Sequence, residues 1–175
     1  MKLEFELREE DFLTFQLFTS STSPRIIRKK KNGWMFLTLG SILFAALFYS
    51  FGNIPLAVCM AFFAVTTALF YPMYFKWRYK KHYQNFIKDN YSNRLGLMQT
   101  LEIHPDHVFL KDKTGESKIK IAEIEEMTEI SSHFFIKISS GVSLIVPKDR
   151  INLEEVSAKI KALDIKINDL SNWKW

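Results

Sequence analysis

The chain has 175 residues, 24 Lys and Arg against 19 Asp and Glu, and one cysteine. One thiol excludes an internal disulfide and a cysteine-based zinc site, so neither a secreted disulfide scaffold nor a zinc finger is expected. Residues 92–175 hold twelve basic and thirteen acidic side chains, so the basicity lies outside the C-terminal half. A nucleic-acid partner is therefore not expected, because it requires a basic face on a folded domain.

The first 31 residues predict a strand, a short amphipathic helix and a basic linker. Apolar and polar residues alternate over Lys2–Arg8, which is typical of a half-buried strand over Leu3–Leu7. Acidic residues 9–11 then suit the start of a helix. The apolar face of this helix packs on the C-terminal domain or lies in the plane of the lipid headgroups. Thr19–Pro24 is interpreted as a linker.

Residues 32–75 carry no charge. The pair Gly52-Asn53 divides this stretch into 34–51 and 54–75, which form helices of roughly 27 and 33 Å if continuous. A hydrocarbon core is about 30 Å thick, so the pattern predicts a transmembrane helical hairpin. A buried helix pair in a soluble protein is excluded, because helices that are apolar on every face need complete burial and the remaining residues are too few to cover both.

Basic residues flank both predicted spans, whereas the turn between them has none. Short basic flanks stay on the cytoplasmic side, so the chain is expected in the cell membrane with both termini cytoplasmic. The flanks either contact anionic lipid headgroups or only fix the topology. The candidate lipid contacts are Arg25, Arg28, Lys29, Lys30, Lys31, Lys76, Arg78, Lys80 and Lys81.

Residues 76–99 predict a juxtamembrane helix and linker, with the helix ending near Asn90 or Asn93. Residues 100–164 predict a cytoplasmic domain of short strands closed by a helix that begins near Asn152. The predicted strands are Thr100–Ile103, Val108–Leu110, Ser117–Ile121, Glu126–Ile130, Phe134–Ile138 and Val142–Val146, with Leu3–Leu7 as a seventh. Turns are expected at 104–106, 113–115 and 139–141. Residues 165–175 form a tail to which no structure is assigned.

Four segments follow one another in the C-terminal part: Ile121-Ala122-Glu123-Ile124, His133-Phe134-Phe135-Ile136, Leu144-Ile145-Val146-Pro147-Lys148 and Asn152-Leu153-Glu154-Glu155. Taken in this order, they resemble the YcxB-like family of bacterial membrane proteins. The resemblance implies an α+β membrane protein, in which a transmembrane helical hairpin carries an antiparallel pleckstrin-homology-like (PH-like) sheet or barrel with a C-terminal helix. It implies no catalytic residues.

The sequence contains no recognisable catalytic, cofactor-binding or metal-binding motif. His104 and His107 flank Asp106, but no third ligand has a suitable spacing, so a plain hairpin turn is expected there. Glu123, Glu125, Glu126 and Glu129 are interpreted as a solvated face. The predicted spans contain no ionisable side chain other than Cys59 and tyrosines, which argues against transport.

We therefore expect a non-enzymatic membrane protein that presents a binding domain at the inner leaflet. Its partners are the lipid bilayer and a peptide, a protein or a lipid headgroup; a second copy of the chain is a further option. Exposed sheet edges are suited to accept an added strand from a partner. A role in bacteriocin or toxin immunity, or in envelope stress, is the alternative.

Overall fold

The structure is a computed structural model that describes residues 1–113, 115–161 and 165–175. It contains two compact units. The first consists of Met1–Phe15 and Gln84–Lys174, and the second of Gln16–Tyr83 with Trp175. The predicted turn at 113–115 includes Thr114, and the predicted end of the C-terminal helix includes Leu163; both residues lie outside the described part of the chain.

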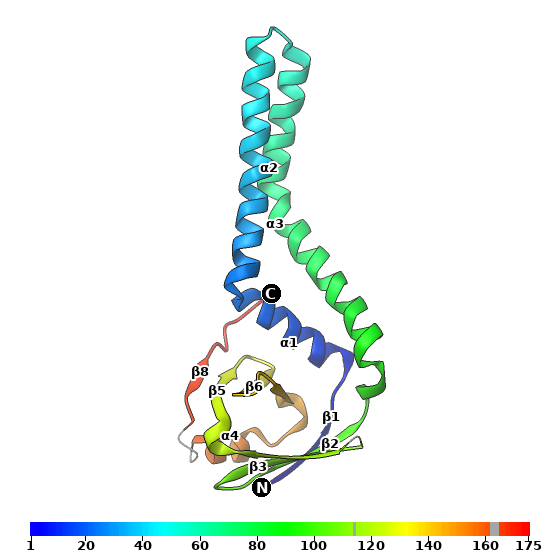
Figure 1. The fold of residues 1–175 in the computed structure, drawn as a ribbon, viewed down its shortest axis with the longest axis vertical. Coiled ribbons are helices and arrows are strands. Elements are labelled where there is room, and N and C mark those ends of the chain that lie inside the picture. The colour runs from blue at the N-terminus through cyan, green and yellow to red at the C-terminus, as the bar shows by residue number, and fades with distance from the viewer. Residues whose placement is uncertain (114, 162–164) are drawn as a thin grey trace. The chain divides into compact units, whose positions relative to one another are not determined.

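The first unit contains an antiparallel sheet in the order β1-β2-β3-β4 (Figure 1). Its strands are β1 (Lys2–Glu6), β2 (Met98–Ile103), β3 (His107–Asp112) and β4 (Gly115–Lys120). In the pairing of β1 with β2, Leu3 lies opposite Leu101 and Phe5 opposite Gln99. The side chains of Leu3 and Phe5 are buried, as the alternation of apolar and polar residues predicts. The N-terminal strand thus joins a sheet built from residues that follow both long helices.

A second sheet in the same unit has the order β7-β6-β5-β8. It comprises β5 (Ile124–Glu129), β6 (His133–Ile138), β7 (Ser143–Pro147) and β8 (Ile167–Asp169), and helix α4 (Leu153–Lys161) lies between β7 and β8 in the chain. Strand β8 runs parallel to β5, so the tail contains a strand that the sequence pattern does not predict. The other pairs are antiparallel. Short 3₁₀ turns occur at Ser92–Arg94, Ile121–Glu123 and Lys148–Arg150.

The core of this unit draws side chains from both sheets and from two helices. Leu101 and Val108 come from the first sheet, Met127 from the second, Ile87 from α3 and Val156 from α4, and each is at most 2% exposed. Helix α1 (Glu9–Thr22) begins in this unit. The ring of its Phe15 meets that of Phe135 edge-on, with 5.2 Å between centroids, so the first turns of α1 pack on the domain.

The second unit contains α2 (Pro24–Ser50) and most of α3 (Ile54–Tyr91). The linker predicted over Thr19–Pro24 is wrong: α1 continues to Thr22 and α2 begins at Pro24. Proline is tolerated in the first helical turn, where its missing N–H has no intrahelical partner. The hydroxyls of Ser20 and Thr22 bond to carbonyls one turn earlier, which satisfies them within a helix. Helix α2 therefore starts ten residues before the predicted span.

The turn between α2 and α3 lies at Gly52-Asn53, the pair that divides the uncharged stretch. Gly52 adopts a left-handed conformation with φ of 73°, which ends α2 at low steric cost. The side-chain oxygen of Asn53 lies 3.3 Å from the backbone N of Leu56 and caps α3. At the other end, α3 continues beyond the uncharged stretch to Tyr91, close to the predicted end near Asn90.

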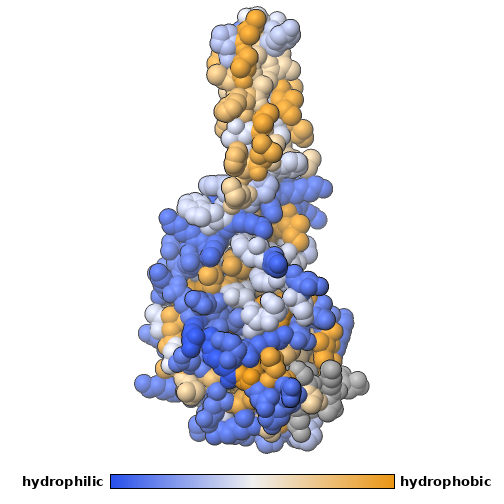
Figure 2. All heavy atoms as spheres, turned by 180° about the vertical axis from the view of Figure 1, so that it is seen from behind, coloured by the Kyte–Doolittle hydropathy of each residue, from blue (hydrophilic) through white to orange (hydrophobic). Residues whose placement is uncertain are grey.

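Helices α2 and α3 are long and apolar enough to cross a membrane. In α2, only 6% of the most apolar 18-residue segment is buried. In the second helix, 11% of the corresponding segment is buried. Figure 2 shows apolar side chains along the outer surface of this helix pair. The two helices contact one another at Trp34, whose Nε1 donates to the carbonyl of Ala68 at 3.2 Å. Most of their apolar surface nevertheless has no cover from the described residues.

Candidate functional site

The nine basic residues predicted as lipid contacts lie on two helical segments. Five occupy the first two turns of α2, and four occupy the middle of α3. Eight are exposed, and Lys30 is half-buried. The Nζ atom of Lys30 is 6.0 Å from the ring centre of Phe75, and that of Lys81 is 5.3 Å from the ring of Trp77. Cation–π contacts of this kind hold the charge beside an aromatic surface.

Two of the nine, Lys29 and Arg78, line one cavity between α2 and α3. We call it the interhelix cavity; its volume is about 380 Å³. Its other lining residues are Ile26, Tyr71, Phe75, Tyr79, His82 and Tyr83. All eight belong to the second unit, which we call the helical unit. The structure thus groups one cation from each flank, whereas the other seven predicted contacts lie outside this cavity.

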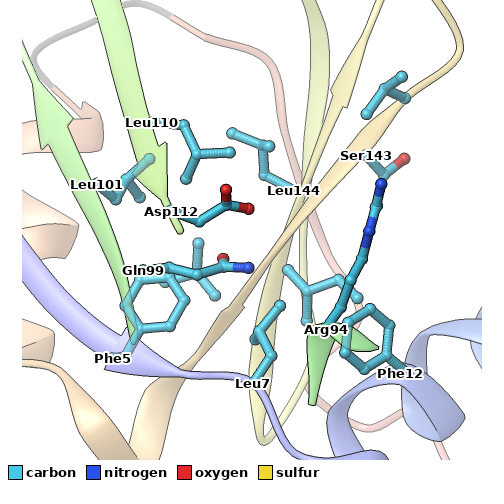
Figure 3. A pocket seen from close by; sticks show the side chains of 13 residues that line it. Phe5, Leu7, Phe12, Arg94, Gln99, Leu101, Leu110, Asp112, Ser143 and Leu144 are labelled. Atoms are coloured by element: carbon cyan, nitrogen blue, oxygen red, sulfur yellow. The ribbon is translucent and has the colours of Figure 1, made fainter. Parts of the chain in front are cut away.

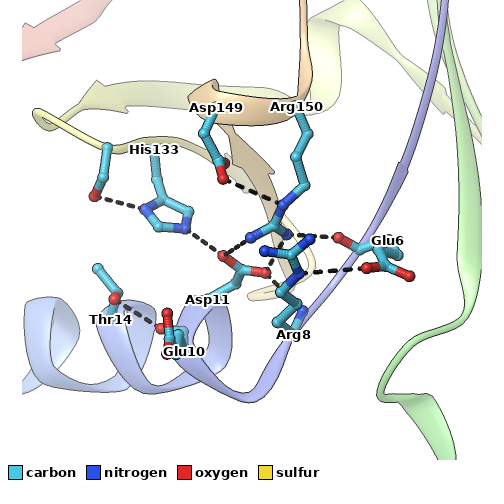
Figure 4. Close-up of polar contacts among 9 residues, drawn as sticks. Glu6, Arg8, Glu10, Asp11, Thr14, His133, Asp149 and Arg150 are labelled. Atoms are coloured by element: carbon cyan, nitrogen blue, oxygen red, sulfur yellow. Dashed lines mark hydrogen bonds and ion pairs between the residues drawn. The ribbon is translucent and has the colours of Figure 1, made fainter.

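A buried polar cluster in the first unit links three distant parts of the chain, as Figure 4 shows. The Oδ1 atom of Asp11, on α1, is 2.9 Å from Nε2 of His133 on β6. Its Oδ2 accepts from Nη1 of Arg150 at 2.6 Å and from the backbone N–H of Arg8 at 2.6 Å. Asp11 is 2% exposed and His133 6%. We call these residues the Asp11 cluster.

The Asp11 cluster holds a carboxylate in its ionised form. Burial alone raises the pKa of Asp11, but hydrogen bonds from His133, Arg150 and the backbone of Arg8 outweigh it and lower the pKa to about 2. The same hydrogen bond to Asp11 raises the pKa of Arg150. Nη1 of Arg150 also donates to the carbonyl of Glu6 at 2.7 Å. The cluster therefore fixes the end of β1 and the start of α1 on the domain.

Ser132, His133 and Asp11 contact one another in the order of the groups in a hydrolytic triad. Ser132 Oγ is 2.8 Å from Nδ1 of His133, so a hydroxyl, an imidazole and a carboxylate follow one another. In a triad the carboxylate stabilises a positive imidazolium during the reaction. Here Arg150 already neutralises Asp11 with two contacts, at 2.6 and 3.3 Å. The arrangement therefore favours a structural role for the cluster.

A second cavity, of about 140 Å³, lies between the two sheets of the first unit, and Figure 3 shows its lining. Apolar side chains such as Phe5, Leu101 and Leu144 form most of its wall. Polar lining comes from Arg94, Gln99 and Asp112, and the whole of 142–146 borders it. The cavity is large enough for an aliphatic side chain, and it adjoins β7, an outer strand of its sheet.

The predicted hairpin turn at 104–106 is present between β2 and β3. The rings of His104 and His107 stack with 4.5 Å between centroids. Nδ1 of His107 is 2.7 Å from Asp106, and Nε2 of His104 is 3.3 Å from Glu102. Each imidazole thus has its own carboxylate. Among the described residues, no group of three or more His, Cys, Asp or Glu is arranged to hold a metal ion.

The glutamates interpreted as a solvated face have more partners than that interpretation implies. Glu125 pairs with Lys137, and Glu129 pairs with Lys148 at 2.7 Å. Glu126 accepts from the side chain of Asn168 at 2.9 Å. Lys137 lies on β6 and Asn168 on β8, the two strands that pair with β5, and Lys148 follows β7. Glu123 is exposed.

Sequence reasoning did not identify the Asp11 cluster. Asp11 was interpreted only as part of an acidic helix start, and Arg150 was not singled out. One signal was available: His133 opens a run of three apolar residues that predicts a buried strand, and a buried polar group needs a partner. The partner lies 122 positions away, and one sequence does not indicate it.

Comparison with known proteins gives one match. Residues 103–161 match the family model of YcxB-like proteins. This segment runs from the end of β2 to the end of α4 and contains all four stretches on which the predicted resemblance rests. No curated protein and no solved structure matches the chain significantly. The predicted resemblance to the YcxB-like family is therefore confirmed, over residues 103–161.

Proposed function

We propose that this chain is an integral protein of the cell membrane that holds a PH-like binding domain at the inner leaflet. In this proposal α2 and α3 cross the bilayer as a hairpin, and both termini are cytoplasmic. The β-domain binds a peptide or protein partner beside the membrane. Because the helices anchor the domain there, the effective concentration of domain and partner for each other is raised.

The uncovered apolar surface of α2 and α3 carries the proposal. A core helix of a soluble protein is mostly buried, whereas only 6% and 11% of the apolar windows of these helices are buried. Phe36, Phe62 and Leu69 are 80%, 74% and 68% exposed. Burying such side chains away from water gains about 1.5–3 kcal/mol each. Lipid supplies that burial along the uncharged stretch, residues 32–75, of both helices.

The pairing of β1 with β2 supports a hairpin with both ends on one side. Strand β1 precedes both helices and β2 follows them, and five residue pairs join the two strands. If the helices span the bilayer, the chain must cross it an even number of times for these strands to meet. Short basic flanks stay on the cytoplasmic side of a membrane, and this supports a cytoplasmic location for both termini.

The strand arrangement supports the PH-like assignment. Seven strands, β1 to β7, precede α4 in the chain; β1 to β4 form one sheet, and β5 to β7 form the other together with β8. Antiparallel strands followed by a helix are the layout that the YcxB-like resemblance implies. The edge of β5, a candidate for strand addition, is covered by β8. The outer strand β7, with the inter-sheet cavity beside it, is the better surface for an added strand with an apolar side chain.

Membrane insertion and topology can be tested together in the full-length chain. In a Cys59→Ser background, single cysteines are placed at Asn53, in the turn, and at Lys174, near the C-terminus. The protein should stay in the membrane pellet after an alkaline wash. An impermeant maleimide should label Asn53→Cys in intact spheroplasts and Lys174→Cys only after lysis. Recovery in the supernatant, or labelling of Lys174→Cys from outside, contradicts the proposal.

A further inference from the structure

We propose that the interhelix cavity binds the phosphate group of one anionic phospholipid, with Lys29 and Arg78 as its cationic contacts. The inference rests on the proposed membrane insertion of α2 and α3. It goes beyond it by assigning a defined lipid site to two of nine basic residues, in place of diffuse attraction between the flanks and the membrane surface.

The position of the cavity along the helices matches the headgroup region. The uncharged stretch covers residues 32–75, and Lys29 and Arg78 each lie three residues outside it. At about 1.5 Å per residue, three residues place each cation roughly 4.5 Å beyond the hydrocarbon edge. Tyr71 and Phe75 line the cavity from inside the stretch. The two cations therefore lie just outside the uncharged stretch, with Tyr71 and Phe75 on its hydrocarbon side and Tyr79 and Tyr83 beyond them. A phosphate group between the cations, with its glycerol region against Tyr71 and Phe75, fits this arrangement.

Charge in the helical unit favours an anion from outside the chain. Residues 16–83 contain nine Lys and Arg and no Asp or Glu. Among the ion pairs of the described residues, none involves Lys29 or Arg78. Two cations that face one cavity repel each other unless an anion lies between them. Guanidinium and ammonium groups are the side chains that bind phosphate most strongly.

Aromatic side chains give the cavity a fixed wall. The rings of Phe75 and Tyr79 stack with 4.3 Å between centroids. The hydroxyl of Tyr83 lies 2.6 Å from Oγ of Ser20, which holds this ring in place. Tyr79 also lines the cavity, and its hydroxyl, which is protonated at neutral pH, is available as a donor to a phosphate oxygen. These contacts distinguish the cavity from freely moving surface lysines.

The test is native mass spectrometry of the full-length protein in detergent, titrated with dioleoylphosphatidylglycerol. Dioleoylphosphatidylcholine and inorganic phosphate are the comparison probes. We expect one phosphatidylglycerol to bind in preference to phosphatidylcholine. The Lys29→Gln/Arg78→Gln variant should weaken this binding about a hundred-fold, because each charge-assisted hydrogen bond to the phosphate contributes a factor of about ten. Tyr79→Phe should weaken it less.

A matched variant separates a defined site from general charge. Lys31→Gln/Lys80→Gln also removes one cation from each helix, but neither residue lines the cavity. It should weaken binding less than about three-fold, since only diffuse attraction is lost. Equal losses in the two double variants overturn the inference. Displacement of the lipid by millimolar inorganic phosphate also overturns it, since the site would then accept the free anion.

Membrane pelleting of every variant distinguishes this inference from the proposed function. If the unmodified protein does not pellet with membranes, the proposed function fails. If it pellets and the Lys29→Gln/Arg78→Gln variant binds phosphatidylglycerol as tightly as the unmodified chain, only the lipid site fails. If that double variant does not fold, Tyr79→Phe decides: unchanged binding then counts against the site.

Discussion

Asp11 is a buried carboxylate with three donors directed at it. Arg150 and His133 come from elements 139 and 122 residues away, and the backbone N–H of Arg8 comes from the preceding turn. Removing one partner from a buried ion pair costs about 3–5 kcal/mol, because the other charge is left uncompensated. Asp11 is thus the single residue on which the attachment of β1 and α1 to the domain depends most.

Asp11→Asn should destabilise the domain in a pH-dependent way. The carboxyl has a pKa of about 2 in the folded chain and 3.8 as its ordinary value. Its ionisation therefore contributes about 2 kcal/mol to the free energy of unfolding above pH 4. This contribution is lost as the pH falls from about 4 towards 2. The difference in the free energy of unfolding between the unmodified chain and Asp11→Asn should shrink over that range. Urea unfolding in detergent at several pH values measures it.

Asp106→Asn is the control for this experiment. The pKa of Asp106 is also lowered, by its hydrogen bond to His107, but its side chain is exposed. Solvent screens such a pair, so little change in stability is expected at any pH. A difference between the unmodified chain and Asp11→Asn that stays constant from pH 7 to pH 2 contradicts the assigned role of the carboxylate.

At the scale of elements, Gly33 of α2 faces the side chain of Tyr71 of α3. A Cβ atom at Gly33 would overlap the Tyr71 hydroxyl, whereas at Gly40 it would meet nothing within 4 Å. Both glycines lie inside α2. A Cβ atom therefore requires a shift of the Tyr71 side chain at the first glycine and no shift at the second, although the sequence presents the two alike.

Gly40→Ala should raise the thermal stability of the helical unit, and Gly33→Ala should not. Alanine in place of glycine in a helix interior gains about 0.5–1 kcal/mol. At Gly33 the contact with Tyr71 offsets this gain. Thermal unfolding in detergent, followed by circular dichroism, measures both variants. The Gly33→Ala/Tyr71→Phe variant should recover the gain; failure to do so would show that the hydroxyl is not the obstacle.

Length and periodicity predicted most elements of the chain. The uncharged stretch with its Gly52-Asn53 turn predicted the two long helices, and alternation predicted β1 and the antiparallel strands. Strand β8 was missed because three residues are too few to show a period, and Ile167 and Leu170 remain 37% and 42% exposed. The Asp11 cluster and the interhelix cavity were missed because they depend on which elements meet, and local patterns carry no such information.

At the scale of the whole molecule, two long helices separate strands that pair with each other. Deleting residues 54–75 leaves one span and, in the proposed topology, puts β1 and β2 on opposite sides of the membrane. The sheet cannot then form, so limited proteolysis should degrade the C-terminal domain rapidly. Replacing residues 32–75 by a flexible linker should restore resistance, because β1 and β2 then share one compartment. If the one-span variant resists proteolysis as well as the unmodified chain does, the hairpin topology is contradicted.

The pairing of the second residue of the chain with Glu102 also sets an order of events during synthesis. Translation at about 5–20 residues per second brings β2 out of the ribosome roughly 5–20 s after β1. Throughout that interval Leu3 and Phe5 have no strand to cover them. The first sheet can therefore be completed only after both helices have been made. In the proposed topology, this couples maturation of the domain to membrane insertion.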